Sequence, residues 1–537
     1  MSATPHHVPV LIVGSGLAGT STAMFLGLHG VRPLLVERHP GTSNQPKARG
    51  QSWPTMEALR IAGVSERIRA AGYDLDLGMP IVVAESVTGR VLHEIIGEKW
   101  PEFPDLTPER MGMASQERAE PILADRAREL GAELRFETRL ESFEQDTDGV
   151  TVVLADLRTG ERRTVRADYL VAADGWRGGI RDAAGIGVHG RGEIGRSLSV
   201  VFDADLADAV LGREYALFYL QNPAVEGSAA FVSTDTPGRW VTLFDYHPER
   251  GERLTDYPEE RLVEIVRRIV GLPDLPVEIV TVAETGIAHR VADRFSAGRV
   301  HLVGDAAHTM PPHGGQGGNT AVMDGFYLAW KLAAVVQGWA GPGLLDSHDT
   351  ERRPYGEMIA GQQYANMITR SMPHLADGTE DAPIPPEQGM FGYRYPGGAV
   401  VPEPDEDGAR LEDPTHPTGR PGSHAPHFWL TRDGERMPVL DLFGRGFVLL
   451  TASDAWAKAA AEVADGLGVP LRAEVIGGPD GLAGRHSLVA DGDWHGRYGI
   501  GPEGATLVRP DRFVAWRTSA PADAAPLEAA LRKVLDR

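Results

Sequence analysis

"VPVLIVGSGLAGTSTAMFLGLHGVRPLLVER", residues 8–38, predicts a strand, a glycine-rich turn, a helix and a second strand in direct succession. Val10–Val13 form a continuous apolar run, which is typical of a strand buried on both faces of a parallel sheet. We predict the helix over Leu17–Leu28 and the second strand over Leu34–Val36. This order of elements favours an α/β fold whose first unit holds a ligand at the turn.

The turn contains the spacing GxGxxG, at Gly14, Gly16 and Gly19. The first glycine permits a tight turn, the second lets a pyrophosphate approach the backbone, and the third allows the helix to pack closely on the strand. Free N–H groups and the dipole at the start of the helix favour the same anion. Glu37 ends the second strand, where a carboxylate can bind ribose hydroxyls and would repel a 2′-phosphate, and Arg38 points to the other side. The turn therefore predicts the adenosine half of FAD or NAD rather than NADP.

The composition of the chain limits its number of domains and the partners that it can have. Its 537 residues suggest two or three domains, and 75 acidic against 53 basic residues give a formal net charge of -22, which repels nucleic-acid backbones. The chain has no cysteine, so thiol chemistry is excluded and electron transfer would need a bound cofactor. The 18 histidines show no HExxH spacing, so we expect no metal. With no basic leader and no run of roughly 18 apolar residues, we expect a cytoplasmic protein with neither a membrane nor a nucleic-acid partner.

Two later motifs decide which dinucleotide is bound. "YLVAADGWRGGIR", residues 169–181, is a strand ending in Asp174-Gly175, and "RVHLVGDAAH", residues 299–308, is a strand ending in Gly304-Asp305. Together with the glycine turn, these motifs resemble the flavin-dependent aromatic hydroxylases of the para-hydroxybenzoate hydroxylase type, in which the three motifs jointly hold FAD. The resemblance covers nearly the whole chain. It implies a Rossmann-like FAD-binding domain, an inserted antiparallel-sheet substrate domain and a C-terminal thioredoxin-like α/β domain.

The resemblance also assigns roles to individual residues. It implies that Glu37 binds the adenosine ribose, that Arg49 lies beside the pyrophosphate and flavin, and that Gln116 and Asp305 reach the ribityl chain. The alternative for Arg49 and Gln116 is an ordinary solvated position. The full set of cofactor-binding residues that we expect is Gly14, Gly16, Leu17, Ala18, Gly19, Glu37, Arg38, Arg49, Gln116, Leu140, Asp174, Gly304, Asp305, Pro312, Gly318 and Asn319.

If Asp305 holds the ribityl chain, the loop Pro311–Asn319 runs along the edge of the isoalloxazine ring. Its prolines stiffen the backbone, and its glycines let N–H groups approach the ring. A helix predicted over about Asn319–Val336 then points its positive end at the N1/O2 side of the flavin, where charge collects on reduction. No residue is needed as a nucleophile. The catalytic contribution of the chain is this flavin-edge loop, through Pro312, Gly315, Gly318 and Asn319.

The chain departs from the family pattern at two positions. Gly178 stands where the motif around Asp174 usually carries a serine, and Tyr327 stands where the helix after Asp305 often carries an asparagine. The first departure affects the geometry expected for nicotinamide binding near that motif, and it leaves the flavin assignment in place.

The resemblance implies a monooxygenase reaction. Because no second GxGxxG occurs in a strand-helix context, NADPH, or else NADH, would bind transiently to reduce the flavin. Dioxygen would then form a C4a-hydroperoxide that hydroxylates a phenolate-like ring in a dry pocket. "VFDADL" and "LLDSHDTERRP" are most similar to aromatic polyketide hydroxylases, which implies a polycyclic aromatic substrate. The alternatives are a Baeyer-Villiger-type or ring-opening oxygenation, a non-oxygenating flavin dehydrogenase, and a protein that binds a polyaromatic without turnover.

The domain organisation follows from the same comparison. We expect the FAD-binding domain over 1–184 and 290–371, the substrate domain over 185–289, a linker over 372–404 and the C-terminal domain over 405–537. Without cysteine the last domain cannot do dithiol chemistry, so we expect a structural or dimerising role in a monomer or homodimer. Alternation along "RWVTLFDY" and its neighbours predicts antiparallel strands in the substrate domain. The candidate residues lining the substrate pocket, with core packing as the alternative for each, are Tyr219, Phe231, Phe244 and His289.

Overall fold

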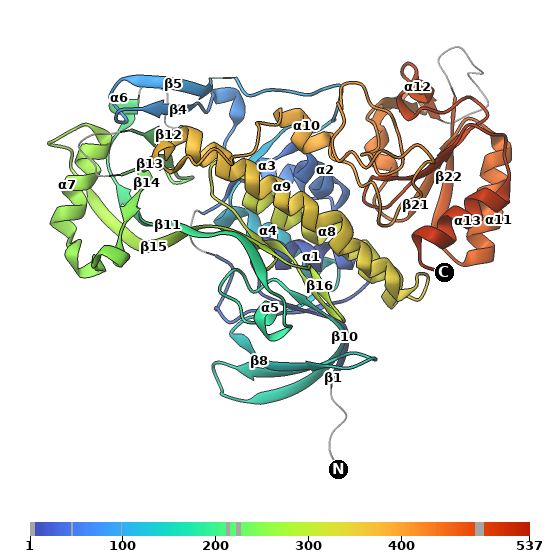
Figure 1. Cartoon of the computed structure of the whole chain (residues 1–537), viewed down its shortest axis with the longest axis horizontal. Helices are drawn as coiled ribbons and strands as arrows, with labels where there is room; N and C mark the ends of the chain where they lie inside the picture. Colours follow the sequence, from blue (N-terminus) through green and yellow to red (C-terminus); the bar gives the residue numbers. More distant parts are fainter. Residues whose placement is uncertain (1–5, 44–46, 98, 211–214, 222–226, 478–487) are drawn as a thin grey trace.

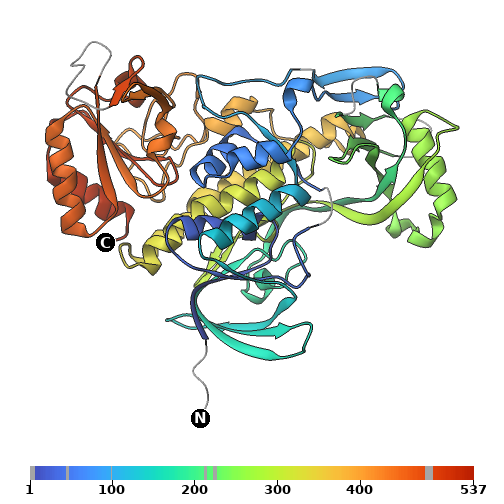
Figure 2. The ribbon, with the colours of Figure 1, turned by 180° about the vertical axis from the view of Figure 1, so that it is seen from behind.

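Two long helices, α8 (Gln316–Val336) and α9 (Asp346–Arg370), cross the centre of the molecule (Figure 1). The computed structural model describes residues 6–43, 47–97, 99–210, 215–221, 227–477 and 488–537. A sheet covered by helix α7 lies beyond one end of the two long helices and the C-terminal unit beyond the other, and Figure 2 shows the same order from behind. The mixed α/β fold class is confirmed. Over the described residues, no helix combines the length and apolar character needed to cross a membrane.

The first sheet is built around β1, whose residues Val10, Leu11 and Ile12 are fully buried. β1 pairs in parallel with β10 on one side and β2 on the other, giving the order β16-β17-β10-β1-β2-β7. The first part of β10 also pairs antiparallel with β9, which pairs with β8. The strands are β1 (His6–Val13), β2 (Leu34–Val36), β7 (Glu133–Arg135), β8 (Thr138–Gln145), β9 (Val150–Asp156), β10 (Arg162–Ala172), β16 (Ser296–Ala297) and β17 (Val300–Leu302).

Helices α1 (Leu17–Leu28) and α8 pack closely against each other over this sheet. A Cβ atom at Gly325 of α8 would lie 2.7 Å from the Thr22 hydroxyl of α1, so only glycine allows this approach. Their shared core includes Phe25 and Phe326, with ring centroids 4.9 Å apart. The other elements of this unit are α2 (Trp53–Ile61), α3 (Ser65–Ala71), α4 (Gln116–Glu129), α5 (Ile180–Ala183), β3 (Arg49–Gln51), β6 (Gly112–Ser115), and the 3-10 helices η1 (Leu75–Leu77), η4 (Gly304–Ala306) and η5 (Pro342–Leu345).

The middle sheet has the order β18-β15-β11-β14-β13-β12-β4-β5. The expected antiparallel strands between the Asp174 and Asp305 motifs form most of it, but β4 and β5 come from before the first of these motifs, and β4 pairs in parallel with β12. Helix α7 covers one face with Leu262 and Val266. The elements are β4 (Ile81–Ala84), β5 (Val91–Ile96), β11 (Val188–Asp203), α6 (Ala207–Val210), β12 (Leu217–Leu220), β13 (Ala229–Ser233), β14 (Arg239–Tyr246), η2 (Pro248–Arg250), η3 (Leu254–Asp256), α7 (Glu259–Val270), β15 (Glu278–Ala292) and β18 (His308–Thr309).

The C-terminal unit is a sheet of order β20-β19-β23-β22-β21-β24-β25. β21 and β22 are parallel and flank α11 in the chain, whereas β24 and β25 add antiparallel strands. Helices α11 and α13 close one core, which includes Trp330 of α8 together with Trp456 and Phe447. The elements are β19 (Trp429–Arg432), β20 (Glu435–Pro438), η7 (Val439–Leu442), β21 (Phe447–Thr451), α11 (Asp454–Leu467), β22 (Leu471–Gly477), β23 (Leu488–Ala490), α12 (Trp494–Tyr498), β24 (Ala505–Val508), β25 (Val514–Thr518) and α13 (Ala524–Val534).

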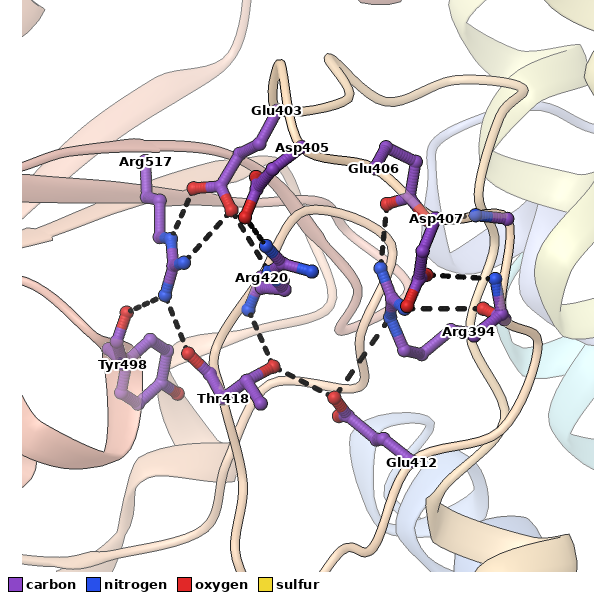
Figure 3. Close-up of polar contacts among 12 residues, drawn as sticks. Arg394, Glu403, Asp405, Glu406, Asp407, Glu412, Thr418, Arg420, Tyr498 and Arg517 are labelled. Carbon is purple, nitrogen blue, oxygen red and sulfur yellow. Dashed lines mark hydrogen bonds and ion pairs between the residues drawn. The ribbon is translucent and has the colours of Figure 1, made fainter.

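The segment joining α9 to the C-terminal unit contains η6 (Pro373–Leu375) and α10 (Pro386–Phe391) and then an acidic stretch held by arginines. Arg517 pairs with Glu403 at 2.7 Å and Arg394 pairs with Glu406 at 2.7 Å, while Arg420 contacts Asp405 (Figure 3). The stretch that we expected as a linker therefore includes residues bound to the C-terminal unit by charge.

A fully buried ion cluster joins the central helices to the C-terminal unit. Glu351 of α9 accepts from Lys331 of α8 at 2.6 Å and from both terminal nitrogens of Arg509 at 2.7 and 2.9 Å. Arg509 also pairs with Asp511, which accepts the indole N–H of Trp330 at 2.7 Å. All four charged side chains are enclosed, so each depends on its partners for the solvation it has lost.

Candidate FAD site

The three glycines of the turn have three different surroundings. Gly14 has a φ of +106° and a Cβ atom there would lie 2.2 Å from the carbonyl oxygen of Ala173. A Cβ at Gly19 would lie 1.9 Å from the carbonyl oxygen of Gly14. At Gly16, which precedes α1, the nearest protein atom to such a Cβ is a carboxylate oxygen of Glu120 at 3.8 Å. The space at Gly16 is therefore open to a ligand, whereas the other two glycines are required by the backbone itself. Leu17 and Ala18 follow in the first turn of α1.

Glu37 lies beside the turn and is already hydrogen-bonded. Its carboxylate accepts the backbone N–H of Ser15 at 2.8 Å and that of His39 at 2.8 Å. Arg38 is exposed and contributes positive charge near Asp174. Leu140 lies on β8 and packs into the core on the face of the first sheet opposite to α1. It is two residues beyond Thr138, whose N–H donates to the carbonyl of Glu37.

Arg49 and Gln116 lie together on paired elements. Arg49 begins β3 and pairs with Asp235 at 2.9 Å, and both side chains are nearly enclosed. Gln116 begins α4, its backbone N–H donates to the carbonyl of Ala48 at 2.8 Å, and its side chain donates to Glu120 at 2.6 Å. Burial raises the pKa of Glu120, although the N–H of Ser43 and the amide of Gln116 oppose this effect. Neither Arg49 nor Gln116 is an ordinary solvated residue.

The motif at Asp174 follows β10. One carboxylate oxygen accepts the N–H of Ile180 at 3.1 Å, the other is buried with no hydrogen-bond partner among the described residues, and burial raises the pKa of this carboxyl. A Cβ at Gly178 would lie 2.0 Å from the Asp174 carboxylate, so any larger residue at Gly178 would displace Asp174. The glycine at position 178, where the family usually carries a serine, therefore leaves room for the Asp174 carboxylate.

The motif at Gly304 and Asp305 forms η4 directly after β17. Gly304 has a φ of +59°, and a Cβ atom there would lie 2.8 Å from the Cβ of Ala18, which brings the turn against the start of α1. Asp305 is exposed to solvent, yet surrounding protein removes enough hydration to raise the pKa of its carboxyl. An exposed carboxylate bordered by protein is available to accept from ligand hydroxyls.

The flavin-edge loop Pro311–Asn319 leads into α8, which begins at Gln316 rather than at Asn319 as expected. Gly315 precedes the helix with a φ of +66°, and Pro312 is exposed. A Cβ at Gly318 would lie 3.1 Å from both Ala48 and Leu17, so the loop passes close to both. The amide of Asn319 accepts the N–H of Ser52 at 2.8 Å and donates to the carbonyls of Gly50 at 3.1 Å and Gly315 at 2.9 Å. Its side chain fixes the loop against β3 and the start of α2.

The four candidate pocket residues lie in three different surroundings. Tyr219 of β12 stacks on His313 of the flavin-edge loop, with ring centroids 5.3 Å apart. Phe231 and Phe244 belong to the core that α7 closes, on the other face of the middle sheet. His289 of β15 accepts the N–H of Arg191 and is partly exposed. Among the four, the structure brings only Tyr219 into ring contact with the loop.

Two small cavities flank Asn319. One, of about 30 Å³, lies between α2, α8, α9 and α10 and is lined by Tyr327, Arg352 and Tyr395 among others. The other, of about 10 Å³, lies beside Leu17 and Gly318. Such volumes hold one or two water molecules rather than an aromatic ligand. Tyr327, the second departure from the family pattern, packs over the guanidinium of Arg352 at 4.7 Å from its ring centroid.

Three residues outside the expected set contact residues of the candidate site: Asp235, Glu120 and Asp324. Asp324 is fully buried on α8 and accepts the N–H of Gly304 at 3.0 Å. An acidic residue inside a helix whose other residues are mostly apolar is the sequence signal that indicates Asp324. No comparable local signal exists for Asp235, because its partner lies far away in the sequence. Within the described ranges no cluster of His, Asp and Glu could hold a metal ion.

Three features of the site fit FAD: the open space at Gly16, the Asp174 carboxylate oxygen without a partner among the described residues, and the exposed carboxylate of Asp305. The comparisons with known proteins agree. A family model described as an FAD binding domain matches residues 7–362, and one described as the C-terminal part of aromatic-ring hydroxylases matches residues 418–537. The fold and the site define an FAD-dependent monooxygenase.

Relatives over the full chain are consistent with this class. The chain is 44% identical to aklavinone 12-hydroxylase RdmE of Streptomyces purpurascens, with 99% of each chain covered. It is 40% identical to the tetracenomycin A2 monooxygenase-dioxygenase of Streptomyces glaucescens, covering 99% of this chain and 97% of that protein. A crystal structure of aklavinone-11 hydroxylase with FAD and aklavinone superimposes with a TM-score of 0.92 at 42% identity, covering 100% of both chains. The protein belongs to the family of FAD-dependent aromatic hydroxylases, and the expected family and cofactor are confirmed.

Proposed function

We propose that this enzyme uses FAD, dioxygen and NADPH, or else NADH, to hydroxylate a polycyclic aromatic substrate of the polyketide type. The observation that carries the proposal is the contact between the flavin-edge loop and the middle sheet, where Tyr219 stacks on His313. The face of the middle sheet that carries Tyr219 therefore lies against the flavin-edge loop. Phe231 and Phe244, on the opposite face, fill the core under α7.

The chain's own residues would bind FAD along one continuous path. The N–H groups at the start of α1 would hold the pyrophosphate at Gly16, where a side chain is absent and space is open. Glu37 would accept from the adenosine ribose, and Asp305 from the ribityl hydroxyls. Asp174, whose second carboxylate oxygen lacks a partner, supplies a further acceptor at the edge of the first sheet.

When bound, FAD would supply the redox chemistry, with NADPH or NADH as the reductant and dioxygen as the source of the inserted oxygen. The protein's contribution is to position the ring and keep water away from it. The loop is fixed by Asn319 on one side and by Arg370 on the other, since Arg370 donates to the carbonyl of His313 at 2.6 Å. Burial lowers the pKa of His313 to about 3, so this histidine is neutral and contributes no charge beside the ring.

The substrate class is inferred from the named relatives. RdmE is an aklavinone hydroxylase, and the superimposed crystal structure contains aklavinone. The test starts with the visible spectrum of the purified enzyme, followed by NADPH and NADH oxidation with polycyclic and monocyclic phenols under ¹⁸O₂. We expect flavin bands, faster oxidation with a polycyclic phenol, and a product with one ¹⁸O on an intact ring. Acceleration by monocyclic phenols alone would contradict the substrate class.

A second candidate reaction is a Baeyer-Villiger-type or ring-opening oxygenation. It is favoured by the 40% identical relative whose name includes both monooxygenase and dioxygenase, since oxidation outcomes differ among such close relatives. A lactone or a cleaved ring would establish this alternative. A product without added oxygen would instead indicate a dehydrogenase.

A further inference from the structure

An ion pair joins the middle sheet to the proposed flavin site. Arg49 of β3 and Asp235 of the turn between β13 and β14 lie 2.9 Å apart, with side chains 10% and 3% exposed. The turn is held in shape because the Thr234 hydroxyl donates to the carbonyl of Arg239 at 2.9 Å. Asp235 therefore approaches Arg49 from a fixed part of a different sheet.

Asp235 also contacts the start of α4. Its second carboxylate oxygen accepts the backbone N–H of Ser115 at 3.1 Å and lies 3.6 Å from the guanidinium of Arg118, which is 44% exposed. The backbone carbonyl of Asp235 also accepts from Arg118 at 2.6 Å. Ser115 immediately precedes Gln116, the residue expected at the ribityl chain. One carboxylate thus connects the arginine and the helix start that the FAD site is expected to use.

The guanidinium of Arg49 is not satisfied by these contacts. Its Nη1 is buried and has no hydrogen-bond partner among the described residues, and the same holds for the Ser115 hydroxyl. Burial lowers the pKa of Arg49, while Asp235 opposes that effect. A buried donor without an acceptor is costly, so this geometry is suited to an acceptor supplied by a ligand.

The location of Arg49 identifies that ligand. The carbonyl of Arg49 lies 3.8 Å from the Cβ position of Gly315, and the next residue, Gly50, accepts from Asn319. The backbone of Arg49 therefore lies next to the flavin-edge loop, and the following residue, Gly50, is hydrogen-bonded to that loop. The guanidinium nitrogen that does not contact Asp235, Nη1, is the one left without an acceptor among the described residues.

We propose that Asp235 is a positioning residue that orients Arg49 toward the cofactor and balances its charge, so that the middle sheet sets the reduction potential of FAD. This inference rests on the proposed placement of Arg49 at the flavin. Because reduced flavin carries more negative charge, an unbalanced Arg49 favours reduction. Loss of the Asp235 charge therefore raises the potential.

The test measures the flavin midpoint potential and the FAD dissociation constant in Asp235→Asn, Arg49→Gln and the double variant. Asp235→Asn should shift the reduction equilibrium by roughly tenfold toward reduced flavin, which is about 30 mV for a two-electron couple. Most of that shift should disappear in the Arg49→Gln background. Asp235→Glu, which keeps the charge, should restore a near-wild-type potential.

Asp203→Asn is the matched control, because Asp203 pairs with Arg239 at 2.8 Å in the same sheet and is 38% exposed. It should leave the potential unchanged. A full shift that persists without Arg49, or no shift at all, would overturn the proposal. If Asp235→Asn does not fold, Asp235→Ser provides the uncharged variant. If neither variant folds while Asp203→Asn does, Asp235 has a structural role and the proposal is rejected. By contrast, an Arg49→Gln protein with unchanged potential and FAD affinity would reject the placement of Arg49 itself.

Discussion

The carboxylate of Asp324 accepts the backbone N–H of Gly304 at 3.0 Å, so helix α8 holds the turn that presents Asp305. The same carboxylate bonds His308 at 2.8 Å and Arg352 at 2.8 Å. Burial alone would raise the pKa of Asp324, but His308 and Arg352 hold it below its usual range. A buried anion with three partners connects the proposed ribityl site to both central helices.

Replacement of Asp324 by asparagine should destabilise the protein and weaken FAD binding. Arg352 would remain buried without its counter-charge, and breaking a buried pair in this way costs about 3–5 kcal/mol. Urea denaturation and FAD titration measure the two effects. The control is Asp274→Asn, an exposed aspartate of the middle unit, which should change the unfolding free energy by less than about 0.5 kcal/mol. Equal stability of the two variants would show that the buried charge is dispensable.

Substitutions at Gly16 and Gly19 should separate ligand binding from folding. Gly16→Val adds atoms where the nearest protein contact is at 3.8 Å, so the chain should fold while the added side chain blocks the pyrophosphate. Gly19→Ala places its Cβ 1.9 Å from a backbone oxygen, so the turn must distort and stability should fall. Circular dichroism and flavin absorbance give both readouts. A yellow Gly16→Val protein would contradict the pyrophosphate assignment.

The sequence was informative where structure depends on local pattern. The helix Leu17–Leu28 and the strand Leu34–Val36 have the predicted bounds, because apolar periodicity and the glycine turn are contained in one short stretch. The start of α8 was misplaced because Gly317 and Gly318 suggest a loop, whereas the positive φ of Gly315 lets the helix begin earlier.

Contacts between distant segments could not be predicted in this way. The addition of β4 to the middle sheet depends on pairing with β12, far along the chain, and a short apolar run does not indicate its partner. The pairing of Arg49 with Asp235 is likewise a consequence of two sheets meeting. Periodicity describes which face of an element is buried and carries no information about which other element covers it.

Stability should fall as pH decreases from about 6.5 toward 4, partly through His348. Burial lowers the pKa of His348 to about 4, against a bond to the Leu302 carbonyl at 2.9 Å that raises it. The unfolded chain therefore takes up a proton near pH 6.5, whereas the folded chain takes it up only at lower pH. Within that window each such histidine lowers the unfolding free energy by about 1.4 kcal/mol per pH unit.

His348→Gln keeps a donor for the Leu302 carbonyl and removes this titration. We expect the unfolding free energy of the variant to depend less steeply on pH between 6.5 and 4, by one proton, with little change above pH 7. Denaturation series at several pH values measure the slope. His416→Gln, at an exposed position, is the control and should leave the slope as in the wild type. Identical slopes for His348→Gln and wild type would mean that folding leaves the pKa of His348 unchanged.

Arg509→Gln should uncouple the C-terminal unit from the central helices. The substitution leaves Glu351 with Lys331 as its one ion-pair partner among the described residues and with the N–H of Ala399, and it removes the direct bond from the end of β24 to α9. We therefore expect a loss of about 3–5 kcal/mol. Unfolding followed by fluorescence and by circular dichroism should then give two transitions in place of one. Arg445→Gln, an exposed position in the same unit, should keep a single transition. A single, unshifted transition in Arg509→Gln would show that the apolar core around Trp330 suffices for docking.

Tyr219 provides the sharpest test of the face of the middle sheet assigned to substrate. Tyr219→Leu removes the ring that stacks on His313, so water should reach the proposed flavin edge. A larger share of the oxidation of the nicotinamide reductant should then end in peroxide. Tyr219→Phe keeps the stack and should keep the coupling of oxidation to product. Phe244→Leu, on the face under α7, should lower stability and leave coupling unchanged, because its side chain packs on Tyr257. Peroxide assays beside product quantification distinguish these outcomes. If Phe244→Leu uncouples the reaction and Tyr219→Leu does not, the substrate lies on the other face of the sheet.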